Sequence, residues 1–439
     1  MTSLQLRTDP SQLDAGADVL LDWFDDDKAA STVRYKPEFL KGLRPSPTAM
    51  DLLRLGGAVF CTDKVVKRAA AQDLWTRDLH LQVPVSDVAL WEGAKSELVK
   101  ALSFLSGDRW DLTFVSSGVG SASAGALASE FDAVSLFSGG LDSLAGVIDL
   151  LEEGRNLLLV GHHDSSLTST KQKLLYRELV RAYGSHRLCL RSLYLRPGHR
   201  RKGQARPLPV GGVENTTRSR SFLFFAAGIA VADALGSRVP LYVPENGFIG
   251  INVPLTPARA GSLSTRTTHP LYMHRMAEAL ALLGLDRTIE NPYRLLTKGE
   301  LLAQNSNSAL LQHLAPKSIS CSHPEAPRWA KKPQGNCGYC YPCLIRRASM
   351  HHIGIDQFRR RYAWDALNDT NLLQTSSKRG RSLRALTASL GRPERREDVL
   401  LNGRIPNGET TAFFDVYCRG RAELRAWLAG AGPALRRRL

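Results

Sequence analysis

The chain has 439 residues, of which 43% are hydrophobic and 23% are charged, and its formal net charge is +16. This composition excludes wholesale disorder, and the length predicts two or three structural units rather than a single core. The N-terminus lacks the apolar core of a signal peptide, and the longest apolar run, residues 222–232, is too short to span a bilayer. We therefore expect a cytoplasmic protein with no membrane partner. The positive net charge favours a negatively charged partner.

Residues 1–128 are predicted to form an accessory α+β domain. Apolar runs predict strands at residues 58–61 and 79–85, and residues 91–105 have the spacing of an amphipathic helix. Residues 116–125 are rich in Gly and Ser, which is typical of a linker. We place a domain boundary at this linker.

Residues 129–355 alternate between strand and helix patterns. The expected strands are residues 134–137, 157–160, 188–195 and 239–243, and the expected helices are residues 143–152, 170–183 and 219–235. This alternation predicts an α/β fold with a doubly wound parallel sheet, whose ligands bind at the carboxyl ends of the strands. Residues 196–217 and 252–270 are expected to be long loops, the first of them a candidate lid.

One motif joins the first of these strands to the first helix. Its residues are Ser138, Gly139, Gly140, Leu141, Asp142 and Ser143. Glycines let backbone N–H groups approach an anion, and the following helix directs its positive dipole there, so the motif predicts a phosphate-binding loop. It differs from the Walker loop and from the dinucleotide fingerprint. A chance Gly-Gly turn is the alternative interpretation.

Four of the seven cysteines lie close together in the sequence, namely Cys321, Cys337, Cys340 and Cys343. Their spacing suits one tetrahedral Zn²⁺ ion, and four thiolates leave no open position for water, so the zinc would be structural. Unrelated free cysteines and an iron–sulfur cluster are the alternatives. His323 is a possible substitute for one cysteine ligand.

Together these motifs resemble the 7-cyano-7-deazaguanine synthase family, called QueC, of the PP-loop ATP pyrophosphatase superfamily. Three segments match in order: the loop at 138–143, the Pro…Thr-Lys-Gly-Glu segment within 291–300, and the Cys-Gly-Tyr-Cys-Tyr-Pro-Cys-Leu-Ile-Arg-Arg segment at 337–347. The match covers about residues 131–355. The gap after Cys321 is longer than in the family, residues 244–270 match only loosely, and both ends of the chain are additions. Extended QueC-like proteins of bacterial anti-phage operons, including Qat and type IV CBASS, have similar additions.

The resemblance implies an ATP-dependent ligase that adenylates the carboxylate of 7-carboxy-7-deazaguanine and releases pyrophosphate, after which an amine displaces AMP. The implied cofactors are ATP, Mg²⁺ and structural Zn²⁺. The additions point to a partner protein of a defence operon as the acceptor, in place of ammonia. Residues 356–439, expected to be a basic helical extension, carry about half of the positive excess and motivate RNA as another acceptor. A non-catalytic ATP-binding scaffold of a defence complex is the third hypothesis.

The resemblance also assigns roles within the site. Backbone amides of the loop would hold pyrophosphate, and Asp142 would place Mg²⁺ or cap the helix. Lys298 would reach the phosphates, with Glu300 orienting it or contacting Mg²⁺, although Thr297 to Glu300 also fits a capping box.

The remaining candidates lie at strand ends or at a helix start. Two arginines at the start of an apolar helix suggest phosphate binding, and one of them is an expected catalytic group beside Asp142 and Lys298. The two arginines are Arg218 and Arg220, and Arg220 is the one expected to be catalytic. Gly161 and His162, which follow the second strand, would lie near adenine. Glu245 and Asn246, which follow the fourth strand, would read the guanine-like edge of the substrate.

Overall fold

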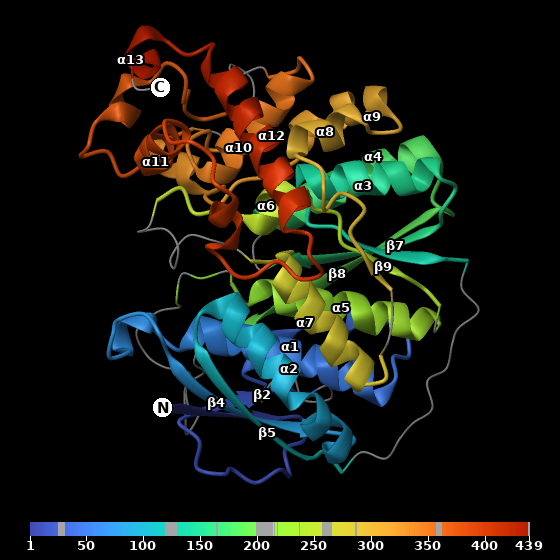
Figure 1. The fold of residues 1–439 in the computed structure, drawn as a ribbon. Helices are drawn as coiled ribbons and strands as arrows, with labels where there is room; N and C mark the ends of the chain where they lie inside the picture. The colour runs from blue at the N-terminus through green and yellow to red at the C-terminus, as the bar shows by residue number, and fades with distance from the viewer. Residues whose placement is uncertain are drawn as a thin grey trace.

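The computed structural model shows a mixed α/β protein with two sheets (Figure 1). It describes residues 1–24, 31–118, 130–163, 166–198, 214, 216, 218–236, 238–256, 266–285, 288–332, 334–356 and 362–437. From bottom to top, Figure 1 shows the smaller sheet, a layer of helices, the larger sheet and a second group of helices. None of the helices among these residues has the length and apolarity needed to cross a membrane.

The smaller sheet is built from the N-terminal part of the chain. Its strands are all parallel and lie in the order β2 (Val19–Asp22), β1 (Thr2–Arg7), β4 (Asp78–Val85) and β5 (Arg109–Ser116). The predicted strand at 79–85 and helix at 91–105 are confirmed as β4 and α2 (Val88–Ser106). Asp87 caps the start of α2, and Gly107 ends the helix in a left-handed conformation.

The strand predicted at residues 58–61 is wrong, because these residues lie within α1 (Pro47–Val65). Helix α1 packs against strands of both sheets and against α5 (Arg220–Leu235), so it is buried nearly all round and shows no one-sided apolar stripe. Gly56 permits this close packing, since a Cβ atom there would lie 2.9 Å from the Cβ of Ala226. A short apolar run does not distinguish such a helix from a strand.

The larger sheet lies at the centre of the molecule (Figure 1). Its order is β10 (Ile289–Glu290), β9 (Leu241–Tyr242), β6 (Ala133–Leu136), β7 (Leu157–His163), β8 (Leu188–Pro197) and β3 (Val33–Tyr35). All neighbours are parallel except β3, which runs antiparallel to β8. The four predicted strands are confirmed as β6, β7, β8 and β9, of which β9 spans only two residues.

Helices cover both faces of the larger sheet. On one face lie α3 (Leu141–Glu152) and α4 (Ser166–Tyr183), and on the other lie α5 and α1, with α7 (Pro270–Leu282) packed against α2 and α5. The three helices predicted between residues 143 and 235 are confirmed as α3, α4 and α5. Most of the loop expected at 196–217, and residues 257–265 of the loop expected at 252–270, lie outside the described residues. Because both faces are covered, β6 and β7 are almost continuously buried.

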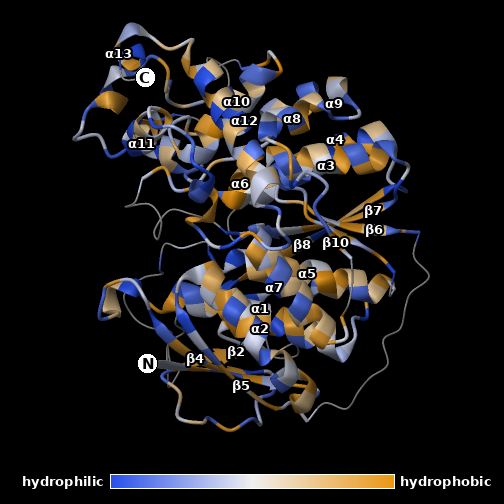
Figure 2. Ribbon diagram, viewed as in Figure 1, coloured by the Kyte–Doolittle hydropathy of each residue, from blue (hydrophilic) through white to orange (hydrophobic). Residues whose placement is uncertain are grey.

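One hydrophobic core joins the smaller sheet to the adjacent face of the larger sheet. Its buried side chains come from both sheets and from α1, α2, α5 and α7, where hydrophobic residues are abundant in Figure 2. The boundary predicted at residues 116–125 lies mostly outside the described residues, and β3 places an N-terminal segment in the larger sheet.

The remaining helices lie above the larger sheet (Figure 1). They are α6 (Gly247–Ile251), α8 (Lys298–Ala303), α9 (Ser308–Leu314), α10 (Tyr341–His352), α11 (Arg381–Leu390), α12 (Thr410–Leu428) and α13 (Pro433–Arg436). A second core is formed by side chains of α6 and α10 to α13, whereas α8 and α9 share a third core with α3 and α4. Helices α11 to α13 occupy the predicted helical extension, and α12 contacts α6, α8 and α10. The C-terminal part of the chain thus packs directly onto the segments that follow β9 and β10.

Candidate functional site

A cavity of about 640 Å³ lies between the loop that follows β6 and the C-terminal part of the chain. One side is formed by loop residues within 138–143 together with Glu245 and Lys298. The other side is formed by residues of the cysteine segment, including Tyr339, and by residues 378, 379, 381 and 382. The strand order explains the position, because β6 and β9 are neighbours whose carboxyl ends meet there.

The loop at residues 138–143 is a tight turn held by its own hydroxyl groups. Ser138 Oγ lies 3.2 Å from Ser143 Oγ and accepts a hydrogen bond from Gly140 N at 3.2 Å. Gly139 has a φ of +80°, and a Cβ atom there would lie 3.2 Å from the side chain of Gln172 in α4. Gly140 precedes α3 without a capping side chain, so the first turn of α3 opens toward the cavity.

Asp142 and Lys298 form a buried ion pair at the cavity. Lys298 Nζ lies 2.8 Å from Asp142 Oδ1, and the two side chains are 8% and 10% exposed. Asn246 Nδ2 donates to Asp142 Oδ2 at 2.7 Å, so both carboxylate oxygens have partners. The structure therefore brings together three predicted site residues from α3, α8 and the segment after β9. Asn246 itself is fully buried and caps α6 through Ile249 N.

Glu300 does not orient Lys298 as expected. The capping box between Thr297 and Glu300 is present, with Thr297 N donating to Glu300 Oε2 at 2.8 Å. Glu300 also forms an ion pair with Arg419 of α12. The start of α8 is further held by Glu423, which accepts hydrogen bonds from the Thr297 hydroxyl and from Gly299 N. The capping interactions fix α8, and the ion pair with Asp142 fixes the Lys298 side chain.

Glu245 is a second carboxyl group on the cavity wall. Its Oε2 accepts a hydrogen bond from the Thr268 hydroxyl, and its backbone carbonyl accepts one from Asn291 Nδ2 at 2.9 Å. Burial raises the pKa of Glu245 to about 7, although the Thr268 hydrogen bond acts in the opposite direction. Glu245 is thus placed where a ligand in the cavity can contact it, and its charge changes near neutral pH.

Gly161 and His162 lie near the end of β7 and Arg220 begins α5, and none of the three is among the residues that line the cavity. Arg220 Nε donates to His162 Nδ1 at 3.0 Å, and His162 Nε2 lies 3.2 Å from the carbonyl of Leu195. This arrangement fits a neutral imidazole with its proton on Nε2. Arg220 therefore holds His162 in place, and the predicted roles of these residues toward adenine and phosphate are not supported by their position.

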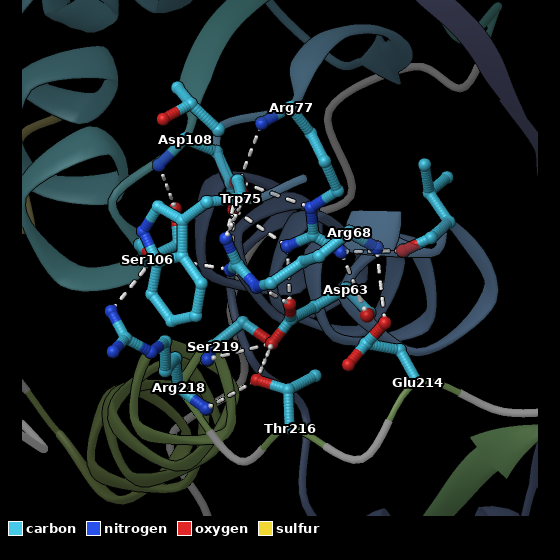
Figure 3. Close-up of polar contacts among 12 residues, drawn as sticks. Asp63, Arg68, Trp75, Arg77, Ser106, Asp108, Glu214, Thr216, Arg218 and Ser219 are labelled. Atoms are coloured by element: carbon cyan, nitrogen blue, oxygen red, sulfur yellow. Dashed lines mark hydrogen bonds and ion pairs between the residues drawn. The ribbon is translucent and has the colours of Figure 1, made fainter. Parts of the chain in front are cut away.

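Arg218 lies in a buried cluster of charged side chains between α1, the start of β5 and α5 (Figure 3). Its Nη1 donates to the carbonyl of Ser106 at 3.1 Å, and its guanidinium group lies 5.0 Å from the centre of the Trp75 ring. Burial and the nearby Arg68 lower the pKa of Arg218 to about 10. Because these contacts are with the N-terminal part of the chain, the position of Arg218 does not support the predicted phosphate contact.

The four predicted metal ligands are brought together by the structure. The Sγ atoms of Cys321, Cys337, Cys340 and Cys343 all lie within 4.8 Å of one another. The Cys321–Cys340 and Cys337–Cys343 sulfur distances are 3.8 and 3.9 Å. A tetrahedral zinc ion with Zn–S bonds of about 2.3 Å places its sulfurs about 3.8 Å apart, so the four side chains fit zinc. His323 contacts this group through its backbone N–H, which donates to Cys321 Sγ.

The cysteine segment also contacts the loop directly. Ile319 N donates to the carbonyl of Gly139 at 3.0 Å, and Leu141 N donates to Ser320 Oγ at 3.2 Å. Arg346 of α10 donates hydrogen bonds to the hydroxyl groups of Ser318 and Ser320, and so helps to fix this contact. A metal bound by the cysteines therefore stabilises the segment that supports the loop.

Sequence reasoning missed the cations that the C-terminal extension contributes to the cavity. Lys378, Arg379 and Arg381 line it, although they are separated from the loop by more than two hundred residues. The only signal was the overall basic charge of the extension, which does not indicate which side chains face the site.

No family model, no curated protein and no solved structure matches this chain. The geometry of the cavity and of the cysteine cluster therefore carries the functional inference.

Proposed function

We propose that the protein is an ATP-dependent adenylating enzyme of the PP-loop type, which splits ATP into AMP and pyrophosphate. The observation that carries the proposal is the glycine loop at 138–143, which joins β6 to α3 and opens a cavity beside the buried Asp142–Lys298 pair. Backbone N–H groups at the start of a helix bind phosphate, and an ammonium group placed in a dry site stabilises charge that develops during phosphoryl chemistry.

The strand order supports this proposal. Counted across the sheet from β8, the parallel strands lie in the order β8, β7, β6, β9 and β10. The first strand in the chain, β6, is therefore in the middle, with the next two strands on one side of it and the last two on the other. This order, with helices on both faces and a reversal of direction between β6 and β9, is the one expected of a doubly wound sheet and supports the proposal on that ground. Nucleotides bind at such reversals, and the loop at 138–143 and Glu245 follow the two strands concerned.

The residues of the site fit ATP and Mg²⁺ by their chemistry. The loop offers backbone donors and hydroxyl groups, and the cavity is large enough for a nucleotide and a small second substrate. Mg²⁺ prefers oxygen ligands and would be held chiefly by the phosphates, with Glu245 as the carboxyl group that keeps a free oxygen among the described residues. Bound Mg²⁺ would neutralise charge on the leaving pyrophosphate.

Residues of the protein would prepare the adenylation step. Ser138, Ser143 and the N–H groups at the start of α3 would bind and orient the pyrophosphate end of ATP. Lys298, held by Asp142, would offset the charge that grows on the phosphates, and Asn246 would keep Asp142 in position. The walls of the cavity would exclude water and so protect the adenylated intermediate from hydrolysis.

The identity of the activated group rests on the QueC-like resemblance of residues 131–355. On that basis, the substrate is the carboxylate of a 7-deazaguanine, and the acceptor is an amine, either ammonia or a group on a partner protein of a defence operon. The C-terminal addition favours the partner protein, since its residues 378–382 include lining residues of the cavity and enlarge the surface around it.

The test is to incubate the protein with ATP, Mg²⁺ and 7-carboxy-7-deazaguanine and to separate the nucleotide products. We expect AMP and pyrophosphate to form only when the carboxylate is present, and Asp142→Ala and Ser138→Ala to lose at least a hundredfold in rate. Unchanged release in both variants would overturn the assignment of the loop. ATP binding with no AMP under any combination of partners would favour the scaffold hypothesis instead.

A further inference from the structure

The C-terminal extension places three cations on the wall of the cavity that faces the loop. Lys378, Arg379 and Arg381 are exposed, and they line the same cavity as Ser138 and Lys298. No carboxylate among the described residues forms an ion pair with any of the three. Other arginines of the extension do form ion pairs with carboxylates, namely Arg419, Arg421 and Arg425.

The segment that carries these cations is held in a fixed conformation. Arg384 of α11 donates hydrogen bonds to the carbonyls of four residues that precede the cations, namely Leu372, Gln374, Thr375 and Ser377. Gly380 packs against the carbonyl of Leu372 so closely that a Cβ atom there would lie 1.7 Å from its oxygen. These contacts fix the backbone of the segment that brings three positively charged residues to one wall of the cavity, where a bound anion would reduce their mutual repulsion.

Arg379 is also linked to the cysteine cluster. Its guanidinium group lies 4.7 Å from the centre of the Trp364 ring, and that ring packs edge-on against Tyr339 at 5.3 Å. Tyr339 lies between two of the metal-ligating cysteines and itself lines the cavity. Trp364 N donates to the carbonyl of Cys337 at 3.0 Å. The metal cluster therefore positions one wall of the cavity through Trp364 and the opposite loop through Ser320.

We propose that Lys378, Arg379 and Arg381 form a second phosphate-binding wall, which holds the triphosphate of ATP against the loop at 138–143. This proposal rests on the proposed function and adds that the C-terminal extension completes the nucleotide site. Three neighbouring cations match a polyphosphate better than they match the single carboxylate of a second substrate, and arginine binds phosphate oxygens in pairs.

The test uses the full chain and measures the binding of inorganic pyrophosphate and of ATP by calorimetry. The triple variant K378Q/R379Q/R381Q is expected to bind both at least tenfold more weakly than the wild type. The matched control R396Q/R404Q/R437Q removes the same charge from exposed positions of the extension that do not line this cavity, and it should change both affinities less than twofold. Arg384→Ala, which frees the segment, should weaken binding like the triple variant.

Wild-type affinity for pyrophosphate and ATP in the triple variant would overturn the proposal. Loss of RNA binding with unchanged pyrophosphate affinity would assign the wall to a nucleic-acid backbone and would also overturn it. The binding measurements do not depend on turnover. Weaker pyrophosphate binding in the triple variant supports the phosphate-binding wall even if the wild type forms no AMP. The absence of AMP would refute only the proposed function.

Discussion

Two carboxyl groups on the same cavity have different surroundings. Asp142 is paired with Lys298 and accepts a hydrogen bond from Asn246, so its negative charge is compensated inside the protein. Glu245 has only the Thr268 hydroxyl as a side-chain partner among the described residues, and burial raises its pKa to about 7. The protonation of Glu245 therefore changes near neutral pH.

Glu245 should make stability depend on pH. Its pKa in the folded protein is about 7, above the value of 4.5 for an unperturbed glutamate, so the folded state favours the protonated carboxyl group. The contribution of the protonated Glu245 to the free energy of unfolding is fully present below pH 4.5 and is lost as the pH rises through 7. Glu245→Gln has no carboxyl group at this position, so its stability should not show this loss. Between pH 5 and pH 8, the free energy of unfolding of the wild type should fall by about 2 kcal/mol relative to that of Glu245→Gln.

Denaturant unfolding at the two pH values measures this difference. Thr268→Val serves as the companion variant, because it removes the hydrogen bond that lowers the pKa of Glu245 and so should increase the loss at pH 8. If Glu245→Gln and the wild type respond equally to pH, the raised pKa is wrong.

At the scale of elements, the sequence predicts what depends on local pattern. The strands β6 to β8 and the helices α3 to α5 follow from apolar runs and helical spacing, and the glycine loop follows from its neighbours in the chain. The capping box at Thr297 and the four cysteines are also local patterns. The roles predicted for Arg218 and Arg220 stay predictions, and their contacts with Ser106 and His162 could not be foreseen because these partners lie more than fifty residues away in the chain and leave no local signal.

The contact between α1 and α5 depends on a buried carboxylate. Asp63 of α1 forms an ion pair with Arg77 at 2.6 Å and accepts hydrogen bonds from the hydroxyl and backbone N–H of Ser219, at the start of α5 (Figure 3). Arg77 and Arg68 also pair with Asp108. Asp63 thereby joins the N-terminal part of the chain to the helix that covers the larger sheet.

Asp63→Ala should lower the free energy of unfolding by about 3 kcal/mol or more, because it leaves buried arginines with one carboxylate fewer and uncaps α5. Thermal and denaturant unfolding measure the effect. The matched control is Asp78→Ala, which breaks an exposed ion pair with Arg109 in the same part of the chain and should change the unfolding midpoint little. Equal effects of the two substitutions would show that the buried cluster does not carry the contact.

At the scale of the whole molecule, charge was a poor guide to individual residues. The basic extension suggested an anionic partner, yet two of its arginines, Arg384 and Arg421, make structural contacts within the protein. Lys378, Arg379 and Arg381 face the cavity only because α11 and α12 pack beside the cysteine segment. The sequence predicted the metal ligands from their spacing, but it did not predict that the metal cluster supports two walls of the site.

The metal cluster should therefore affect both stability and nucleotide binding. We expect one bound zinc ion per chain, and its removal by a chelator should lower the unfolding midpoint and weaken ATP binding at least tenfold, since Ser320 and Tyr339 lose their support. Metal analysis, unfolding and calorimetry measure the three effects. Cys340→Ser should behave like the chelated protein, whereas Cys189→Ser, which lies in β8 away from the cluster, should retain zinc. Full ATP affinity in a zinc-free protein would contradict this coupling.

We propose that a carboxylate is adenylated in the cavity beside Asp142 and Lys298. The most direct test is the exchange of labelled pyrophosphate into ATP in the presence of 7-carboxy-7-deazaguanine and in the absence of any amine. We expect label to enter ATP only when the carboxylate is present, and Asp142→Ala to abolish the exchange. Release of ADP and inorganic phosphate, with no label in ATP, would refute carboxylate adenylation in this cavity.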